Sequence, residues 1–204
     1  MSTQTFPLSQ CATVTPGYST KGAVVHDLDG THQVIMAKHL TVGEPYRYFP
    51  DHELRVVPHG RIDNYLLRPG DILFMSRGAT NYAVLLEAFP QPAIAPSTFY
   101  LLRPREGVDP AYLVWCLGQQ PVLNCLAEIR TGAGMPMIPR PEFAATPIPL
   151  PPLDIQRTIA RLAASQAREK TLRRQLLEET ETQQRVLGQA IFQHLTTDSN
   201  RSTS

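Results

Sequence analysis

The feature that most constrains the fold is where proline and glycine occur. All 19 prolines lie at or before Pro152, and of the 12 glycines only Gly188 lies beyond Gly134. Proline removes a backbone donor and clashes inside a helix, whereas the Leu, Gln, Glu and Arg that dominate after Pro152 favour helices. The pattern predicts a single helix from Leu153 to about Leu195, roughly 65 Å long at about 1.5 Å per residue.

Apolar residues recur along this helix at helical spacing and form a broken stripe. The stripe consists of Ile155, Ile159, Leu162, Leu172, Leu176, Leu187 and Ile191. One small domain does not need so long a helix for its own core, so we expect a coiled-coil arm that pairs with another helix. The alternative is a helix that lies along its own domain. Residues 196–204 are predicted to be a disordered tail.

Length and composition predict one globular domain over residues 1–150, followed by an arm over residues 151–195. The 19 basic and 18 acidic residues leave the chain nearly neutral, so strong electrostatic binding of DNA by the chain alone is not expected. Cys11, Cys116 and Cys125 are odd in number and lack CxxC spacing, which argues against a disulfide framework and a zinc site. No apolar run approaches about 18 residues, so no membrane span is expected, and the cysteine pattern fits a cytoplasmic protein without a metal.

Short β-prone runs alternate with turns and two helical segments, which predicts a mixed α/β (α+β) domain with short strands and long loops. The best-defined unit is residues 65–87, with strands at 72–75 and 82–86. A further strand is predicted at 97–102, and a β-prone run at 33–40. Asp109 and Pro110 have the residue types of a helix cap and first turn, and Pro121 begins a second helix. The first 20 residues are predicted to be an extended lead-in.

Three stretches together resemble the target-recognition domain and conserved helix of type I restriction-modification DNA specificity subunits. They are YLLRPGDILFMSRG, YLVWCL and IRTGAGMPMIPRPEFAATPIPLPPLDIQRTIARL. The resemblance covers roughly Asp63 to Leu195. Its most specific part is the junction PIPLPPxxxQxxI, in which the glutamine is Gln156, and its GDILF turn is moderately specific.

The resemblance implies a non-catalytic, cofactor-free module that reads double-stranded DNA and binds a DNA methyltransferase (modification) subunit. In that family two recognition domains are joined by a pair of antiparallel helices. This chain carries one such domain and one helix, so the resemblance implies a homodimer that pairs its arms and recognises a two-part target. The alternative is pairing with a longer specificity subunit. Whether a restriction or translocase subunit also binds is left open.

Sequence reading requires hydrogen-bonding side chains on loops that can enter the major groove. Three loops carry such residues. The first holds Arg47, Tyr48 and His52; the second holds Arg77, Asn81 and Tyr82; the third holds Arg130, Thr131, Gly134 and Met135. Taken singly, each arginine is more often a solvated surface residue. Their grouping on irregular segments makes them DNA-binding candidates.

One motif suggests an enzyme instead. VVHDLDGT places Asp27 and Asp29 two residues apart, as in haloacid-dehalogenase-like phosphatases that use Mg²⁺. However, His26 interrupts the preceding apolar run, and no later acidic metal motif follows. The segment is therefore predicted to be a turn, and no catalytic residue is assigned. A third alternative is a coiled-coil interaction module that reads no DNA.

Overall fold

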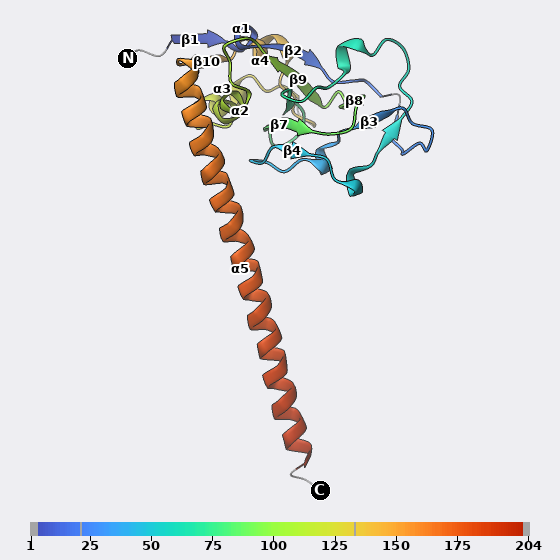
Figure 1. Cartoon of the computed structure of the whole chain (residues 1–204), viewed down its shortest axis with the longest axis vertical. Helices are drawn as coiled ribbons and strands as arrows, with labels where there is room; N and C mark the ends of the chain where they lie inside the picture. The colour runs from blue at the N-terminus through green and yellow to red at the C-terminus, as the bar shows by residue number, and fades with distance from the viewer. Residues whose placement is uncertain (1–3, 21, 133, 202–204) are drawn as a thin grey trace. The chain divides into compact units, whose positions relative to one another are not determined.

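The computed structural model of the 204-residue chain describes residues 4–20, 22–132 and 134–201, with side chains as far as Gln193. It contains two compact units, Met1–Ala163 and Ala164–Ser204. The first is a mixed α/β domain built around a five-stranded sheet, and the second belongs to one long helix (Figure 1). The predicted fold class is therefore confirmed.

A five-stranded sheet forms the centre of the first unit. Across the sheet its strands are β2 (Ala12–Pro16), β9 (Phe99–Pro104), β6 (Ile72–Met75), β7 (Ala83–Ala88) and β4 (Tyr46–Arg47). The pairing of β4 with β7 is parallel and the others are antiparallel. The predicted strand at 72–75 is confirmed, and β7 and β9 overlap the other two predicted strands.

The central strands read as unbroken apolar runs because both faces of the sheet are covered. On one face, Ile72 and Phe74 pack in a cluster that includes residues of three helices from the second half of the domain. On the other face, Leu73 packs with Ile35 and Leu67. The three helices are α2 (Pro110–Leu117), α3 (Gln120–Glu128) and α4 (Arg140–Ala145). This two-sided burial gives the domain a core on each side of the sheet.

Two of these helices were predicted and one was not. The Asp109 carboxylate accepts from the backbone N–H of Tyr112 at 2.9 Å, which confirms it as the cap of α2. The α3 helix begins at Gln120, beside the predicted Pro121. The sequence of α4 reads as a loop because Pro139 and Pro141 flank its first residue, yet both prolines are compatible with a helix start.

The first 20 residues are not a simple extended lead-in. They form β1 (Gln4–Pro7), a single helical turn α1 (Leu8–Cys11) and β2. The β1 strand pairs antiparallel with β10 (Pro147–Leu150), and β2 pairs with β9. Leu8 and Cys11 are fully buried. The expectation was wrong because the strands that pair with this segment lie far along the chain, where local sequence gives no sign of them.

A three-stranded sheet forms a second part of the same unit, in the order β5 (Arg55–Val56), β3 (His32–Val34) and β8 (Ala93–Ile94). The connecting segments include 3-10 turns η1 (Ala37–His39), η2 (Pro50–His52) and η3 (Asp63–Tyr65). The predicted β-prone run at 33–40 stops at Val34, because His39 Nδ1 accepts from the Met36 backbone N–H at 3.1 Å and holds a turn.

The GDILF motif has a structural explanation. Gly70 has a φ of +91°, a left-handed conformation that glycine adopts without strain. The next residue, Asp71, is 2% exposed. Its carboxylate accepts from the Arg68 backbone N–H at 2.8 Å and from two nitrogens of the Arg103 guanidinium, each at 2.9 Å. The motif therefore fixes the turn before β6 to the neighbouring strand β9.

The long helix α5 (Leu153–Arg201) is continuous over 49 residues. It begins where predicted but continues past Leu195, so residues 196–201 are helical rather than a disordered tail, while residues 202–204 lie outside the described part. Among the described residues, no helix has both the length and the apolar character needed to cross a membrane.

The compact domain ends within α5 rather than at residue 150. Gln156 is 1% exposed and hydrogen-bonds to the Asp109 N–H and to the carbonyls of Gly107 and Pro151. Ile159 and Ala160 pack against the first core cluster. The opening turns of α5 therefore belong to the domain, and the junction glutamine locks them in place.

Candidate nucleic-acid interface

The second and third candidate loops form one surface. Residues 76–82 connect β6 to β7, and residues 130–138 lie in the connection from α3 to α4. The Ile138 N–H donates to the Ser76 carbonyl, and the Gly78 N–H donates to the Pro136 carbonyl, each at 2.9 Å. A further bridge pairs Arg77 with Met137. Residues far apart in the sequence are thus held together by backbone hydrogen bonds.

Arg130 ties these two loops to each other. Its guanidinium donates to the Gly78 carbonyl at 2.7 Å and to the Ala79 carbonyl at 3.0 Å. Both hydrogen bonds come from the same nitrogen, Nη2. Arg130 is half-buried, so its structural role is to position the loop that carries Arg77.

The second loop turns two of its candidates inward and one outward. The Asn81 amide donates to the Met75 carbonyl at 2.8 Å and closes the turn. Tyr82 is half-buried, and that burial raises the pKa of its hydroxyl. Arg77 is exposed, and its guanidinium has no hydrogen-bond or ion-pair partner among the described residues. Of the three, Arg77 is therefore the one free to meet a ligand.

The third loop is closed by a pair of backbone hydrogen bonds between Thr131 and Met137, at 2.9 and 2.8 Å. Gly132 has a φ of +98°, and a Cβ added there would lie 3.2 Å from the Met135 carbonyl oxygen. Glycine is therefore required at this position. Thr131, Gly134 and Met135 are exposed, and Met135 is 68% exposed.

Sequence reasoning missed Arg140, which lies at the start of α4 and is exposed. Burial raises the pKa of Tyr100, while the charges of Arg77 and Arg140 act in the opposite direction. The Tyr100 hydroxyl in turn donates to the Ile138 carbonyl at 2.7 Å. No local signal distinguishes Arg140 from other arginines, because its neighbourhood is created by the fold. We call Arg77, Thr131, Gly134, Met135 and Arg140 the loop surface.

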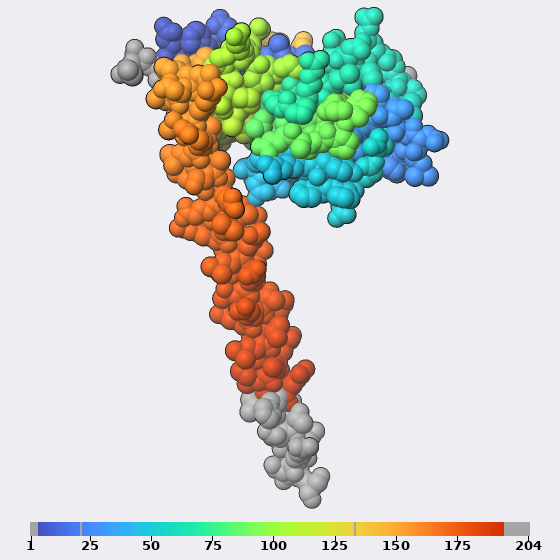
Figure 2. Space-filling view, viewed as in Figure 1, coloured from blue at the N-terminus to red at the C-terminus, as the bar shows by residue number. Residues whose placement is uncertain are grey.

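The first candidate loop lies elsewhere. Arg47 belongs to β4, which pairs with the end of β7 near Ala88, whereas Asn81 precedes the start of β7. The six residues of β7 separate the two places by about 20 Å, taking roughly 3.3 Å per residue. The segment of residues 40–60 (cyan) covers one edge of the domain in Figure 2. The three loops do not form a single surface.

The charged and polar side chains of the first loop are engaged with each other. Arg47 Nε lies 2.7 Å from a Glu87 carboxylate oxygen. The Tyr48 hydroxyl donates to Glu53, a hydrogen bond that raises the pKa of the tyrosine. Glu53 also accepts from Arg55 Nε at 2.5 Å, and the hydrogen bonds from Tyr48 and Arg55 lower the pKa of Glu53. These groups would have to exchange partners to bind DNA.

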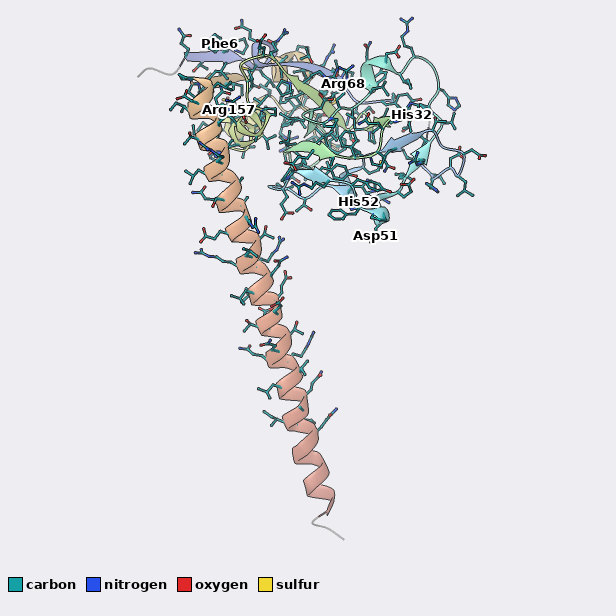
Figure 3. All side chains as sticks on the ribbon, in the orientation of Figure 1. Phe6, His32, Asp51, His52, Arg68 and Arg157 are labelled. Atoms are coloured by element: carbon teal, nitrogen blue, oxygen red, sulfur yellow. The ribbon has the colours of Figure 1, made fainter. Side chains whose placement is uncertain are left out.

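His52, seen at the edge of the domain in Figure 3, packs against aromatic rings. Its ring stacks on His39 and Tyr46, with centroids 4.8 and 5.7 Å away. Burial, together with the nearby His52 and Lys38, lowers the pKa of His39 to about 4, so His39 is neutral at pH 7. The His52 carbonyl accepts from the buried Gln33 amide at 2.8 Å. This cluster holds the loop in shape.

The phosphatase-like motif does not form the geometry that its chemistry needs. Asp27 and Asp29 are both exposed, and residues 23–25 before them are not a strand. The Asp27 carboxylate accepts from the Asp29 backbone N–H at 3.0 Å, which closes a local turn. Within the described residues, no three acidic, histidine or cysteine side chains gather as a metal site.

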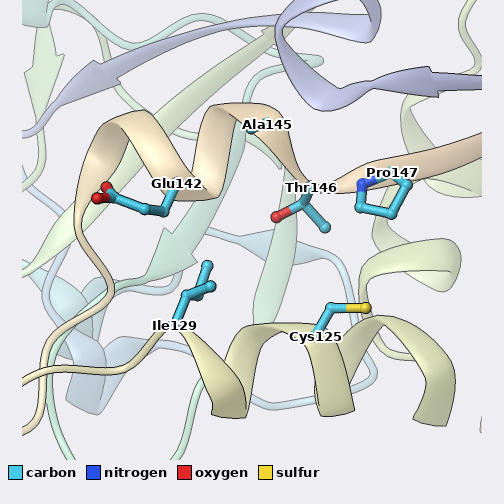
Figure 4. Close-up of a pocket in the computed structure, with 6 residues that line it drawn as sticks. All are labelled: Cys125, Ile129, Glu142, Ala145, Thr146 and Pro147. Carbon is cyan, nitrogen blue, oxygen red and sulfur yellow. The ribbon is translucent and has the colours of Figure 1, made fainter.

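An open cavity of about 270 Å³ lies between α3 and α4 (Figure 4). It is lined by Cys125, Ile129, Glu142, Ala145, Thr146 and Pro147. The Thr146 hydroxyl is buried and has no hydrogen-bond partner among the described residues. None of the sequence-predicted site residues lines this cavity, so it is separate from the loop surface.

The predicted assembly residues of α5 fall into two groups. Ile159 packs against the core of the first unit and is not available to a partner. The other six are exposed, by 43% to 65% of their surface. They are Ile155, Leu162, Leu172, Leu176, Leu187 and Ile191. A helix that leaves this many large apolar side chains in water has a face suited to another helix.

No family model and no curated protein matches the sequence. The similar solved structures come from type I restriction-modification systems. A chain from a study of complex assembly and conformational transition of the type I R-M system aligns with a TM-score of 0.68 and 19% identity, covering 92% of this chain and 44% of that one.

Two further structures have the same fold. The HsdS subunit from Thermoanaerobacter tengcongensis aligns with a TM-score of 0.59 and 18% identity, covering 82% of this chain and 37% of that one. The S subunit of a type I restriction-modification system from M. genitalium aligns with a TM-score of 0.52 and 13% identity, covering 79% and 38%. The present chain thus spans less than half the length of each of the three.

Proposed function

We propose that this protein is a sequence-specific DNA-recognition (specificity) subunit of a type I-like restriction-modification system, directing a partner adenine methyltransferase to a two-part target. The observation that carries the proposal is the fold, which 92% of the chain shares with a type I R-M system chain at a TM-score of 0.68. The GDILF turn and the Gln156 junction support it from the sequence side. In this proposal the protein is non-catalytic, and methyl transfer belongs to the partner.

The loop surface supports the DNA-reading part of the proposal. Arg77 and Arg140 are exposed guanidiniums, which can pair with phosphate or with the O6 and N7 acceptors of guanine. Arg130 holds the loop that carries Arg77. Because the chain carries 19 basic and 18 acidic residues, we expect weak binding by the protein alone and tighter binding when partner subunits add phosphate contacts.

The proposal is tested by purifying the tagged protein from its own cells, so that bound subunits are retained, and selecting duplexes from a random library. We expect a methyltransferase to co-purify and a two-part sequence to be enriched. A restriction or translocase subunit in the same preparation would show a fuller assembly. If no sequence is enriched, the chain does not read DNA, and a coiled-coil interaction module becomes the better description.

Arg77→Ala is expected to weaken binding of the assembled complex to the selected duplex by about 10- to 100-fold, as expected for losing one good guanidinium contact of roughly 1–3 kcal/mol. Thermal stability should stay unchanged, because Arg77 has no partner among the described residues. Fluorescence anisotropy at fixed salt measures the loss. Arg61→Ala is the matched control, since Arg61 is also exposed and its ion pair with Asp63 is long, at 4.0 Å. Equal affinities for Arg77→Ala and wild type would contradict the assignment.

We further propose that α5 pairs with the α5 of a second copy in an antiparallel arrangement. The charges along the helix support this orientation. Residues 157–174 carry six basic side chains and only Glu169 as an acid, whereas residues 175–193 carry three glutamates and only Arg185 as a base. Antiparallel pairing brings the basic half of one helix against the acidic half of the other, and parallel pairing opposes like charges.

A two-fold axis near Arg174 satisfies both the charge pattern and the apolar stripe. It places Arg168 and Lys170 opposite Glu181 and Glu179 of the second copy. It also places Leu162 opposite Leu187 of the second copy. With Leu172 and Leu176 close to the axis, the centre of the interface is apolar. Such a dimer carries two recognition domains related by symmetry, which predicts a palindromic two-part target.

The double substitution Leu172→Asp and Leu176→Asp is expected to abolish self-association, because it puts four carboxylates at the centre of the apolar seam. Sedimentation velocity should show a monomer, where the wild type is a dimer. Gln189→Asp is the control, since Gln189 is exposed and lies on the opposite side of the helix from the stripe. If the double variant remains dimeric, the dimer interface does not include Leu172 and Leu176.

Orientation is tested separately with Leu162→Cys and Leu187→Cys. In the antiparallel arrangement a mixture of the two variants forms a disulfide between unlike chains. Parallel pairing would instead join each variant to itself. A wild-type chain that is monomeric until a longer specificity subunit is added would point to pairing with that subunit.

A further inference from the structure

Backbone hydrogen bonds hold the third loop, around residues 130–138, in place. Its ends are joined by the two Thr131–Met137 hydrogen bonds. Pro136 accepts from the Gly78 N–H, and Arg130 bonds to the carbonyls of Gly78 and Ala79. Restraints on both sides of the loop leave little freedom for a side chain near its middle to find a buried position.

Met135 is that side chain. It is 68% exposed, whereas Met137 is half-buried and Ile138 is fully buried. Pro136 restricts the residue before it to extended conformations, which limits how Met135 can fold back. An unbranched apolar side chain is therefore held in water close to the exposed Arg77, whose backbone pairs with that of Met137. A ligand that fits this surface must offer both negative charge and an apolar group.

Double-stranded DNA offers both. Phosphates provide the negative charge, and the edges of the bases in the major groove are polar except for the 5-methyl group of thymine. We propose that Met135 contacts a thymine methyl group and makes recognition selective for thymine at one position of the target. This inference rests on the proposed DNA-reading function. It adds the base that is recognised, thymine, and the group that is contacted, its 5-methyl group.

The test uses the purified complex and the selected duplex, in which each thymine is replaced in turn by uracil. The exchange removes the methyl group and leaves base pairing intact. For wild type we expect one position to lose about fourfold in affinity, the equivalent of ~0.8 kcal/mol for one buried methyl group. Met135→Ala should lose a similar factor on the thymine duplex and no longer distinguish thymine from uracil at that position.

Leu28→Ala is the matched control, since Leu28 is 92% exposed on a different turn and should leave the discrimination intact. If every uracil duplex binds wild type as tightly as the original, or if Met135→Ala keeps the discrimination, the inference is wrong while the proposed function stands. Met135→Ala that weakens binding without changing discrimination would also overturn it, and would indicate a wedge between bases instead. Failure to select any duplex would overturn the proposed function and this inference together.

Discussion

Replacing Asp71 by asparagine is expected to lower the free energy of unfolding by about 3 kcal/mol. Asp71 is 2% exposed, and its carboxylate accepts from Arg103 and from the Arg68 backbone N–H. The same hydrogen bond to Asp71 raises the pKa of Arg103. Asparagine keeps the size of the side chain but loses the charge, so the guanidinium of Arg103 is left without its counter-ion. The Arg103 side chain is 38% exposed, so water offsets part of the loss and keeps the expected value at the low end for a buried pair.

Urea denaturation measures this effect, with the slope checked to confirm that the transition remains two-state. The control is Asp63→Asn, whose carboxylate is 79% exposed and lies 4.0 Å from Arg61. That substitution should change stability by less than about 0.5 kcal/mol. Adding Arg103→Met to Asp71→Asn should restore part of the lost stability, because it removes the unpaired charge. A loss below about 1 kcal/mol for Asp71→Asn would show that the Asp71–Arg103 ion pair does not stabilise the turn before β6 as we infer.

Gln156→Leu is expected to cost about 3 kcal/mol of stability. Leucine has nearly the same volume but cannot replace the three hydrogen bonds of the amide, which join Asp109, Gly107 and Pro151 to α5. The part-buried Asp109 N–H would lose its acceptor. Since Asp109 also caps α2, the start of that helix and the first turns of α5 should loosen together.

Thermal unfolding measures the loss of stability in Gln156→Leu, and hydrogen exchange shows which part of the structure is destabilised. The Asp109 amide should exchange faster in Gln156→Leu, while amides of β6 and β9 change only as far as global stability falls. Gln166→Leu serves as the control, because Gln166 lies exposed on the same helix. Unchanged protection at Asp109 would mean that its N–H does not depend on Gln156.

Features set by neighbouring residues could be predicted from the sequence. The Asp109 cap, the β6 strand and the start of α5 each depend on residue types within a turn or two, and all three were confirmed. The same local view missed the pairing of β1 with β10 and the helix α4. For β1, the hydrogen-bond partners come from the far end of the domain. For α4, flanking prolines indicate a loop unless tertiary packing decides otherwise.

In the candidate site, too, the sequence predicts local features but not contacts between distant residues. Local sequence identified loops rich in arginine and polar residues but could not say which loops meet. Only the fold pairs Arg77 with Met137, and only the fold uses Arg130 to hold the second loop. It also places Arg47 at the other end of β7. Distances between loops depend on strand order, which a single sequence does not reveal.

The antiparallel pairing of β1 with β10 has an evolutionary consequence. Gln4 lies opposite Leu150, so the first strand of the domain lies beside the strand that leads directly into α5. A different domain that ends in the same β1–β10 pair could precede α5 without any change in the helix. Under the proposed function, new DNA preferences would then arise by exchange of the whole domain, while the helix proposed to pair two copies stays unchanged.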